Sequence, residues 1–105
     1  MQPEPQVLEE LIQRIVEAVH PLRIILFGSA VRGEMNEHSD LDVLVVMPNG
    51  THRRRTAQSL HQFMFGLPLP VDILVATPED LEEHKNNIGL IYYQILREGK
   101  EIYGA

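Results

Sequence analysis

The stretch at residues 27–46, FGSAVRGEMNEHSDLDVLVV, places a glycine turn and two carboxylates between two apolar runs. Gly28 and Ser29 follow a short β-branched run of the kind typical of a buried strand. Eleven residues past Ser29, at Asp40, the sequence Asp-Leu-Asp opens a second such run. Side chains alternate along a strand, so Asp40 and Asp42 are expected on one face, at the mouth of the strand.

A third carboxylate lies in the apolar segment PVDILVA at residues 70–76, which is also expected to be a strand. Asp72 takes the face away from its apolar neighbours Val71 and Ile73. If the two strands are neighbours, three carboxylates converge at one edge of the sheet. Such a cluster is costly to bury without a counter-charge, and a divalent cation with a preference for oxygen ligands, such as Mg²⁺, would supply it.

The Gly-Ser turn offers the complementary half of a phosphate site. Gly28 has no Cβ, so a phosphate can approach the backbone, and Ser29 is expected to begin a helical turn as its N-cap. The first amides of a helix favour an anion. Arg32 and the amide of Gly33 are candidate further donors, although Arg32 is equally able to pair with a neighbouring acid.

Each of these features taken alone has an ordinary structural explanation. A Gly-Ser pair after a strand is usually a turn with a helix cap, and Asp-Leu-Asp is often a solvated strand start. Asp72 alone would be read as an edge residue that faces water. The combination in this order and spacing is far more specific than its parts, and it favours a metal-dependent phosphoryl-transfer site.

The whole chain reads as a single α/β (α+β) domain over residues 1–105, with a small mixed sheet flanked by helices. Residues 1–5 are expected to be a short flexible lead. The expected helices and strands, in chain order, are a helix at 6–20, a strand at 23–27, a helical turn at 29–32, a strand at 41–47, a helix at 51–65, a strand at 70–76, a helix capped by Thr77, a helix at 87–97 and an extended or strand segment at 100–103.

Composition restricts the function further. The chain has 105 residues and a formal charge of −6, which argues against a general nucleic-acid binder. The absence of cysteine excludes disulfides and thiolate metal sites. The polar N-terminus lacks the features of a signal peptide, and no apolar run is long enough to cross a membrane. We therefore expect a cytoplasmic protein without a membrane partner.

These motifs resemble the nucleotidyltransferase superfamily of the DNA polymerase β type, whose signature is Gly-Ser, about ten residues, then Asp-x-Asp. More narrowly, GSAVRG followed by SDLDVLVV is similar to the minimal nucleotidyltransferases, the small antitoxin partners of HEPN-domain toxins. PVDILV resembles the strand that bears the third carboxylate of the family. The segment IGLIYYQILREGKEIYG resembles the family's closing helix and the turn that follows it.

The resemblance implies a role for each matching residue. Gly28 and Ser29 would hold the nucleotide triphosphate, and Asp40 and Asp42 would bind Mg²⁺, with two ions expected. Asp72 would bind the catalytic ion and help activate the acceptor hydroxyl.

Arg32 and Ser39 complete the expected nucleotide-binding set. The family reaction transfers a nucleoside monophosphate from ATP to a hydroxyl and releases pyrophosphate. In the antitoxin subgroup the acceptor is a tyrosine of the HEPN toxin, which implies a hetero-oligomer in which the toxin is silenced by AMP.

Two alternatives stay open. Instead of this enzyme, the chain could be a non-catalytic antitoxin that blocks the toxin by binding. It could also be the catalytic subunit of a small-molecule or RNA nucleotidyltransferase. The short length favours a protein acceptor, because the other acceptors usually need an additional domain. Residues 53–55, three consecutive arginines, are interpreted either as a solvated helix face or as a contact to the triphosphate or to an acidic partner surface.

Overall fold

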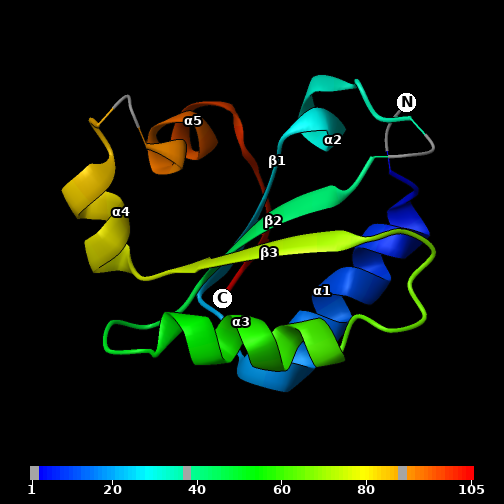
Figure 1. The fold of residues 1–105 in the computed structure, drawn as a ribbon, viewed down its shortest axis with the longest axis horizontal. Coiled ribbons are helices and arrows are strands. Elements are labelled where there is room, and N and C mark those ends of the chain that lie inside the picture. The colour runs from blue at the N-terminus through cyan, green and yellow to red at the C-terminus, as the bar shows by residue number, and fades with distance from the viewer. Residues whose placement is uncertain (1–2, 37–38, 88–89) are drawn as a thin grey trace.

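The computed structural model describes residues 3–36, 39–87 and 90–105, which form a mixed β-sheet with helices on both faces (Figure 1). The strands, in sheet order, are β3 (Val71–Ala76), β2 (Leu41–Val46), β1 (Arg23–Phe27) and β4 (Lys100–Gly104). β1 is antiparallel to both β2 and β4, whereas β2 and β3 are parallel. The predicted fold class, a small mixed sheet flanked by helices, is confirmed.

The helices divide between the two faces of the sheet. They are α1 (Pro5–Val19), α2 (Ser29–Arg32), α3 (Arg53–Gln62), α4 (Pro78–His84) and α5 (Ile91–Glu98). α1 and α3 lie together on one side of the strands, and α4 and α5 lie on the other (Figure 1). A parallel pair such as β2 and β3 needs a crossover connection, which α3 supplies.

Strand alternation creates two separate apolar clusters. Leu41, Val43 and Val45 on β2 face the larger cluster, which includes residues of α1 and α3. Leu44 and Val46 face a smaller cluster closed by α4 and α5. Asp40, just before β2, and Asp42, within it, follow the same alternation as Leu44. Their side chains are therefore expected on the face of the sheet that bears this smaller cluster.

Local signals explain where most helices begin. Thr77 caps α4 through a capping box, in which its side chain accepts from the Asp80 amide and Asp80 accepts from the Thr77 amide, as the sequence predicted. α3 is shorter than the predicted 51–65. Its cap is His52, whose Nδ1 accepts from the Arg55 amide, and the chain leaves the helix before the left-handed Gly66 (φ 91°).

Other boundaries also differ from the sequence-based expectation, most of them by one residue. α1 begins at Pro5, inside the segment expected to be a flexible lead, because proline suits the first helical position. α5 begins at Ile91 rather than at residue 87, and residues 88–89 of that expectation lie outside the described part of the chain. The segment expected at 100–103 to be extended or a strand is a strand, β4, over Lys100–Gly104, and it pairs with β1. Within the described residues, no helix is both long and apolar enough to cross a membrane.

Candidate active site

The register of the sheet places Asp42 between the other two elements of the predicted site. On β1 its direct partner is Phe27, the residue before Gly28, and on β3 its direct partner is Asp72. Directly paired residues on neighbouring strands project to the same face. The predicted proximity of Asp42 and Asp72 is therefore confirmed, on the side of the sheet that α4 and α5 cover.

The electrostatics of Asp42 show that the carboxylates interact. Burial raises the pKa of the Asp42 carboxyl above its ordinary value, and the negative charges of Asp72 and Asp40 raise it further. The positive charge of Arg32 acts in the opposite direction and is the smallest of these effects. The site thus holds more negative charge than its own arginine compensates.

The donor set of the site fits a divalent cation, although its side chains are not arranged as a finished metal cage. Among the described residues, no group of three or more aspartate, glutamate or histidine side chains stands ready to hold one ion. Asp40, Asp42 and Asp72 nevertheless supply the hard oxygen ligands that Mg²⁺ prefers. The raised pKa of Asp42, caused first by burial and then by the charges of Asp72 and Asp40, reflects a cost that a bound cation would relieve.

Gly28 joins the phosphate turn to the acidic cluster. Its backbone has φ 74° and ψ −149°, a conformation that essentially only glycine adopts. A Cβ at Gly28 would lie closer than 3.0 Å to Oδ2 of Asp42, so the carboxylate packs against the bare backbone. Gly28, and not Ser29 as predicted, is the N-cap of α2.

Ser29 is instead the first residue of α2. The amides of Val31 and Arg32 donate to the Gly28 carbonyl at 3.2 and 3.3 Å. The amides of Ser29 and Ala30 therefore precede the helical hydrogen bonds, as expected at a helix start. The predicted position of amide donors beside the acidic cluster agrees with this geometry.

Arg32 lies at the other end of α2, where two acids bracket it. Its Nε is 2.8 Å from Oε1 of Glu34, and its Nη1 is 4.0 Å from Oε2 of Glu98 on α5. The structure thus shows the acid-paired alternative for Arg32, while its charge still reaches Asp42.

Ser39 has a local role in the loop before β2. Its hydroxyl accepts from the Asn36 amide at 3.0 Å, and its own amide donates to the Asn36 carbonyl at 3.1 Å. These two bonds tie Ser39 to Asn36 immediately before Asp40. A contact between Ser39 and the nucleotide stays a prediction.

Two adjoining pockets open beside these residues. One, of about 240 Å³, lies over Asp42 and Asp72. The other, of about 210 Å³, lies between α2 and α5 and reaches Gly28 and Arg32. Both are lined by Phe27 and Ile91, so the two pockets share a wall, and the pair of pockets is called the cleft.

α5 supplies site residues that sequence reasoning missed. Ile91, Gln94 and Glu98 line the pocket that faces α2. The sequence predicted a helix here without assigning any of its residues to the site, and Ile91 is 49% exposed. Helical periodicity cannot tell which element a helix faces, so only the resemblance of this segment to a closing helix pointed to the site.

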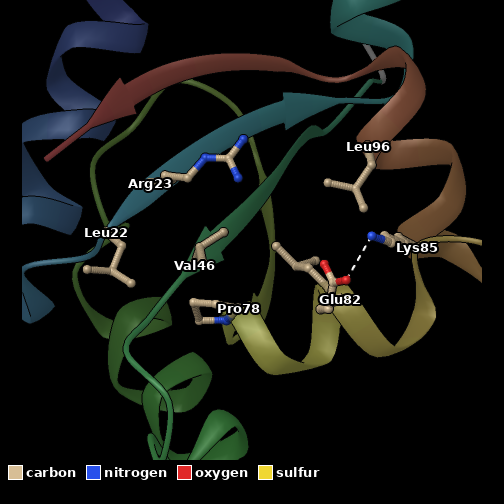
Figure 2. A pocket seen from close by; sticks show the side chains of 8 residues that line it. Leu22, Arg23, Val46, Pro78, Glu82, Lys85 and Leu96 are labelled. Carbon is tan, nitrogen blue, oxygen red and sulfur yellow. Dashed lines mark hydrogen bonds and ion pairs between the residues drawn. The ribbon is translucent and has the colours of Figure 1, made fainter.

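A larger pocket of about 430 Å³ lies elsewhere. Figure 2 shows it between α4, α5 and the strands, lined by residues that include Leu22, Val46 and Leu96, with the Glu82–Lys85 ion pair of 2.8 Å at its rim. Leu22 precedes β1 and Val46 ends β2, so this pocket lies at the opposite end of the strands from Asp42 and Gly28. None of the predicted site residues lines it.

The three arginines at residues 53–55 also lie away from the carboxylates. They begin α3, which follows the far end of β2. Arg53 Nη1 is 3.3 Å from Oδ1 of Asp80, the acid that caps α4. This position favours a structural ion pair over a contact to the triphosphate.

Known proteins share this architecture. The chain superimposes on a crystal structure of a toxin–antitoxin with AMP-PNP at a TM-score of 0.71 and 22% identity, covering 93% of this chain and 73% of the other. A candidate nucleotidyltransferase from Sulfolobus solfataricus gives 0.64 and 17%, with coverages of 94% and 78%. An MntA–HpeT toxin–antitoxin mutant gives 0.53 and 22%, with coverages of 99% and 75%. At these identities the likeness establishes the fold.

Sequence comparison supplies the family. No curated protein matches the chain. Residues 8–103 match the model of the nucleotidyltransferase domain, which therefore includes every residue of the candidate site. The chain belongs to the nucleotidyltransferase-domain family and has its polymerase β-like fold.

Proposed function

We propose that this protein is an antitoxin that transfers AMP from ATP to a tyrosine hydroxyl of a HEPN-domain toxin and so neutralises it. The observation that carries the proposal is the direct pairing of Asp42 with Asp72 beside the Gly28 turn. This pairing supports a cleft in which the nucleotide binds at the Gly28 turn and Asp72 activates the acceptor hydroxyl.

The reaction follows from the placement of these residues. The amides at the start of α2 and the Arg32 guanidinium bind the phosphates of ATP. The tyrosine oxygen bonds to the α-phosphorus while the bond from that phosphorus to the leaving pyrophosphate breaks, and the hydroxyl proton passes to the Asp72 carboxylate. Two Mg²⁺ ions, held by Asp40, Asp42 and Asp72, would supply charge neutralisation for the transferred phosphoryl group.

A protein acceptor is supported by structural likeness. Two of the similar structures are toxin–antitoxin complexes, one of them with an ATP analogue. A toxin subunit in a hetero-oligomer would present its own tyrosine to the exposed Asp72.

The test is to mix the protein with labelled ATP, Mg²⁺ and a candidate HEPN protein and to measure the mass of that protein. We expect increments of one AMP, located on tyrosine. The Asp40→Asn plus Asp42→Asn variant is expected to abolish the transfer. The charge-matched control is Glu82→Gln plus Glu83→Gln on the exposed surface of α4, which should transfer AMP normally.

The outcomes separate the alternatives. Label transfer that survives in the Asp40/Asp42 variant would refute the catalytic assignment. Neutralisation of the toxin without label would identify an antitoxin that acts by binding alone. Transfer of label to an RNA or a small molecule, with the HEPN protein unmodified, would identify the third class of nucleotidyltransferase.

A further inference from the structure

The pocket between α2 and α5 has a polar rim whose groups are linked in a chain. Arg32 contacts Glu34 on its own side of the pocket and approaches Glu98 across it, at 4.0 Å. Gln94, one turn before Glu98, donates to the same Glu98 Oε2 at 3.4 Å. A single carboxylate of α5 is thus held against the arginine of α2.

The interior of this pocket leads to the acidic cluster. Phe27 and Ile95 provide apolar lining, and Gly28 forms the end nearest Asp42. Because Phe27 and Ile91 also line the pocket over Asp42 and Asp72, the two spaces adjoin. A nucleotide with its reacting phosphorus at the carboxylates can extend its remaining phosphates past Gly28, toward Arg32.

We propose that Glu98 is an exchangeable counter-ion for Arg32, the arginine to which the proposed function assigns the phosphates of the nucleotide. This inference rests on the proposed nucleotidyl transfer. With the pocket empty, Glu98 faces Arg32 at 4.0 Å, in addition to the closer Glu34 at 2.8 Å. When a polyphosphate enters, Arg32 exchanges the carboxylate for phosphate oxygens, and Glu98 then repels the bound phosphates, which favours release of pyrophosphate.

The exposure of both groups makes this exchange possible. The side chains of Arg32 and Glu98 are 41% and 54% exposed, so their ion pair is screened by water and easily replaced. Arginine binds phosphate through parallel, charge-assisted hydrogen bonds, which are stronger than a 4.0 Å contact with one carboxylate. Arg32 therefore binds phosphate in preference to Glu98, and the presence of Glu98 lowers the affinity for the phosphate.

The test is to measure the dissociation constants of Mg²⁺-ATP, inorganic pyrophosphate and AMP for Glu98→Gln. We expect tighter binding of ATP and pyrophosphate by about two- to five-fold, the range expected for one exposed charge, and no change for AMP. Glu82→Gln, whose partner Lys85 lies at the pocket shown in Figure 2, is the charge-matched control and should bind all three ligands as the wild type does.

A second variant checks that the effect passes through the arginine. Arg32→Gln should weaken ATP binding, and adding Glu98→Gln to it should give a smaller gain than Glu98→Gln alone. Weaker ATP binding by Glu98→Gln, or equal changes for ATP and AMP, would overturn the proposal. So would unchanged affinities in a variant that circular dichroism shows to be folded, and Glu98→Ala repeats the measurement if the amide variant misfolds.

These measurements require no acceptor protein. An unmodified HEPN protein would refute the proposed acceptor while leaving the expected affinities of Glu98→Gln in place. Conversely, normal AMP transfer with no selective effect of Glu98→Gln would refute only the counter-ion role.

Discussion

The ionised Asp42 side chain destabilises the folded state, a cost that the proposed metal-binding role would explain. Its pKa is raised by burial and by two neighbouring carboxylates, so the folded protein binds a proton at this position more tightly than the unfolded chain does. The resulting contribution to stability is fully present at acidic pH, below the ordinary value of 3.8, and is lost as the pH rises through the raised pKa. At neutral pH the ionised side chain therefore destabilises the fold.

Replacing Asp42 by Asn should remove this cost. We expect the melting temperature of Asp42→Asn to exceed that of the wild type at pH 7 in the absence of divalent ions, and the difference to shrink toward pH 4. Thermal unfolding followed by circular dichroism at both values measures it. A melting temperature at pH 7 below that of the wild type would show that the carboxylate stabilises the site instead.

Gly28 and Gly33 provide a matched pair for testing the close approach of backbone and carboxylate. Both have left-handed φ values, 74° and 72°, but a Cβ at Gly33 would meet nothing within 4 Å, whereas one at Gly28 would collide with Asp42. Gly33→Ala should cost about 1 kcal/mol of unfolding free energy from strain alone.

Gly28→Ala should cost more than Gly33→Ala, by about 1–3 kcal/mol, and should also lose affinity for ATP. Urea unfolding and nucleotide titration give the two quantities. Equal losses for the two variants would mean that the Asp42 side chain turns away freely and that the contact has no consequence.

At the scale of the elements, sequence patterns predicted the strands better than the helix ends. β-branched runs and alternation located β1, β2 and β3, and they placed Asp42 and Asp72 on one face, because strand periodicity is exact. The cap of α2 was assigned to Ser29 because the backbone angles that make Gly28 the cap leave no mark in the residue pattern. The α2–α5 pocket was not predictable from either helix, since it depends on how the sheet brings them together.

One tertiary link that sequence patterns do not reveal joins α1 to the segment after α3. Arg14 donates to the carbonyls of Phe63 and Phe65, and it also pairs with Glu10 on its own helix. These bonds fix a turn in which the Phe65 side chain is 82% exposed. The apolar character of this segment is therefore not explained by the core alone.

Arg14→Met keeps the aliphatic stem but removes the donors. We expect a loss of about 1–2 kcal/mol in unfolding free energy, because two carbonyls lose charge-assisted partners. Denaturant unfolding measures the loss, and Arg54→Met on the exposed start of α3 serves as the control, with an expected change near zero. A similar effect of both variants would assign the loss to charge rather than to the turn.

At the scale of the whole molecule, the cleft connects elements that are distant in the sequence. α2 follows the first strand and α5 precedes the last one, yet both line the same pocket. On the opposite face of the sheet, α1 and α3 pack against the larger cluster and take no part in lining this pocket. A ligand in the cleft should therefore stabilise the elements that line it, α2 and α5, more than α1 and α3 on the opposite face.

Hydrogen exchange can test this one-sided response. Saturating Mg²⁺-ATP should slow amide exchange in α2, in α5 and at the start of β2, while α3 exchanges as in the free protein. Mass spectrometry of peptides from the four elements gives the comparison. Protection spread evenly over α3 and α5 would indicate global stabilisation and would contradict a site confined to this cleft.

The order of the strands separates two kinds of change that selection or design can make. The groups assigned to the donor nucleotide sit on or beside β1 and β2, the two central strands, which packing on both edges constrains. Asp72 belongs to β3, whose outer edge is unpaired within the described sheet. On the proposed function, substitutions along that edge would change the choice of acceptor while the donor half stays intact, so specificity for the acceptor would evolve independently of specificity for the nucleotide.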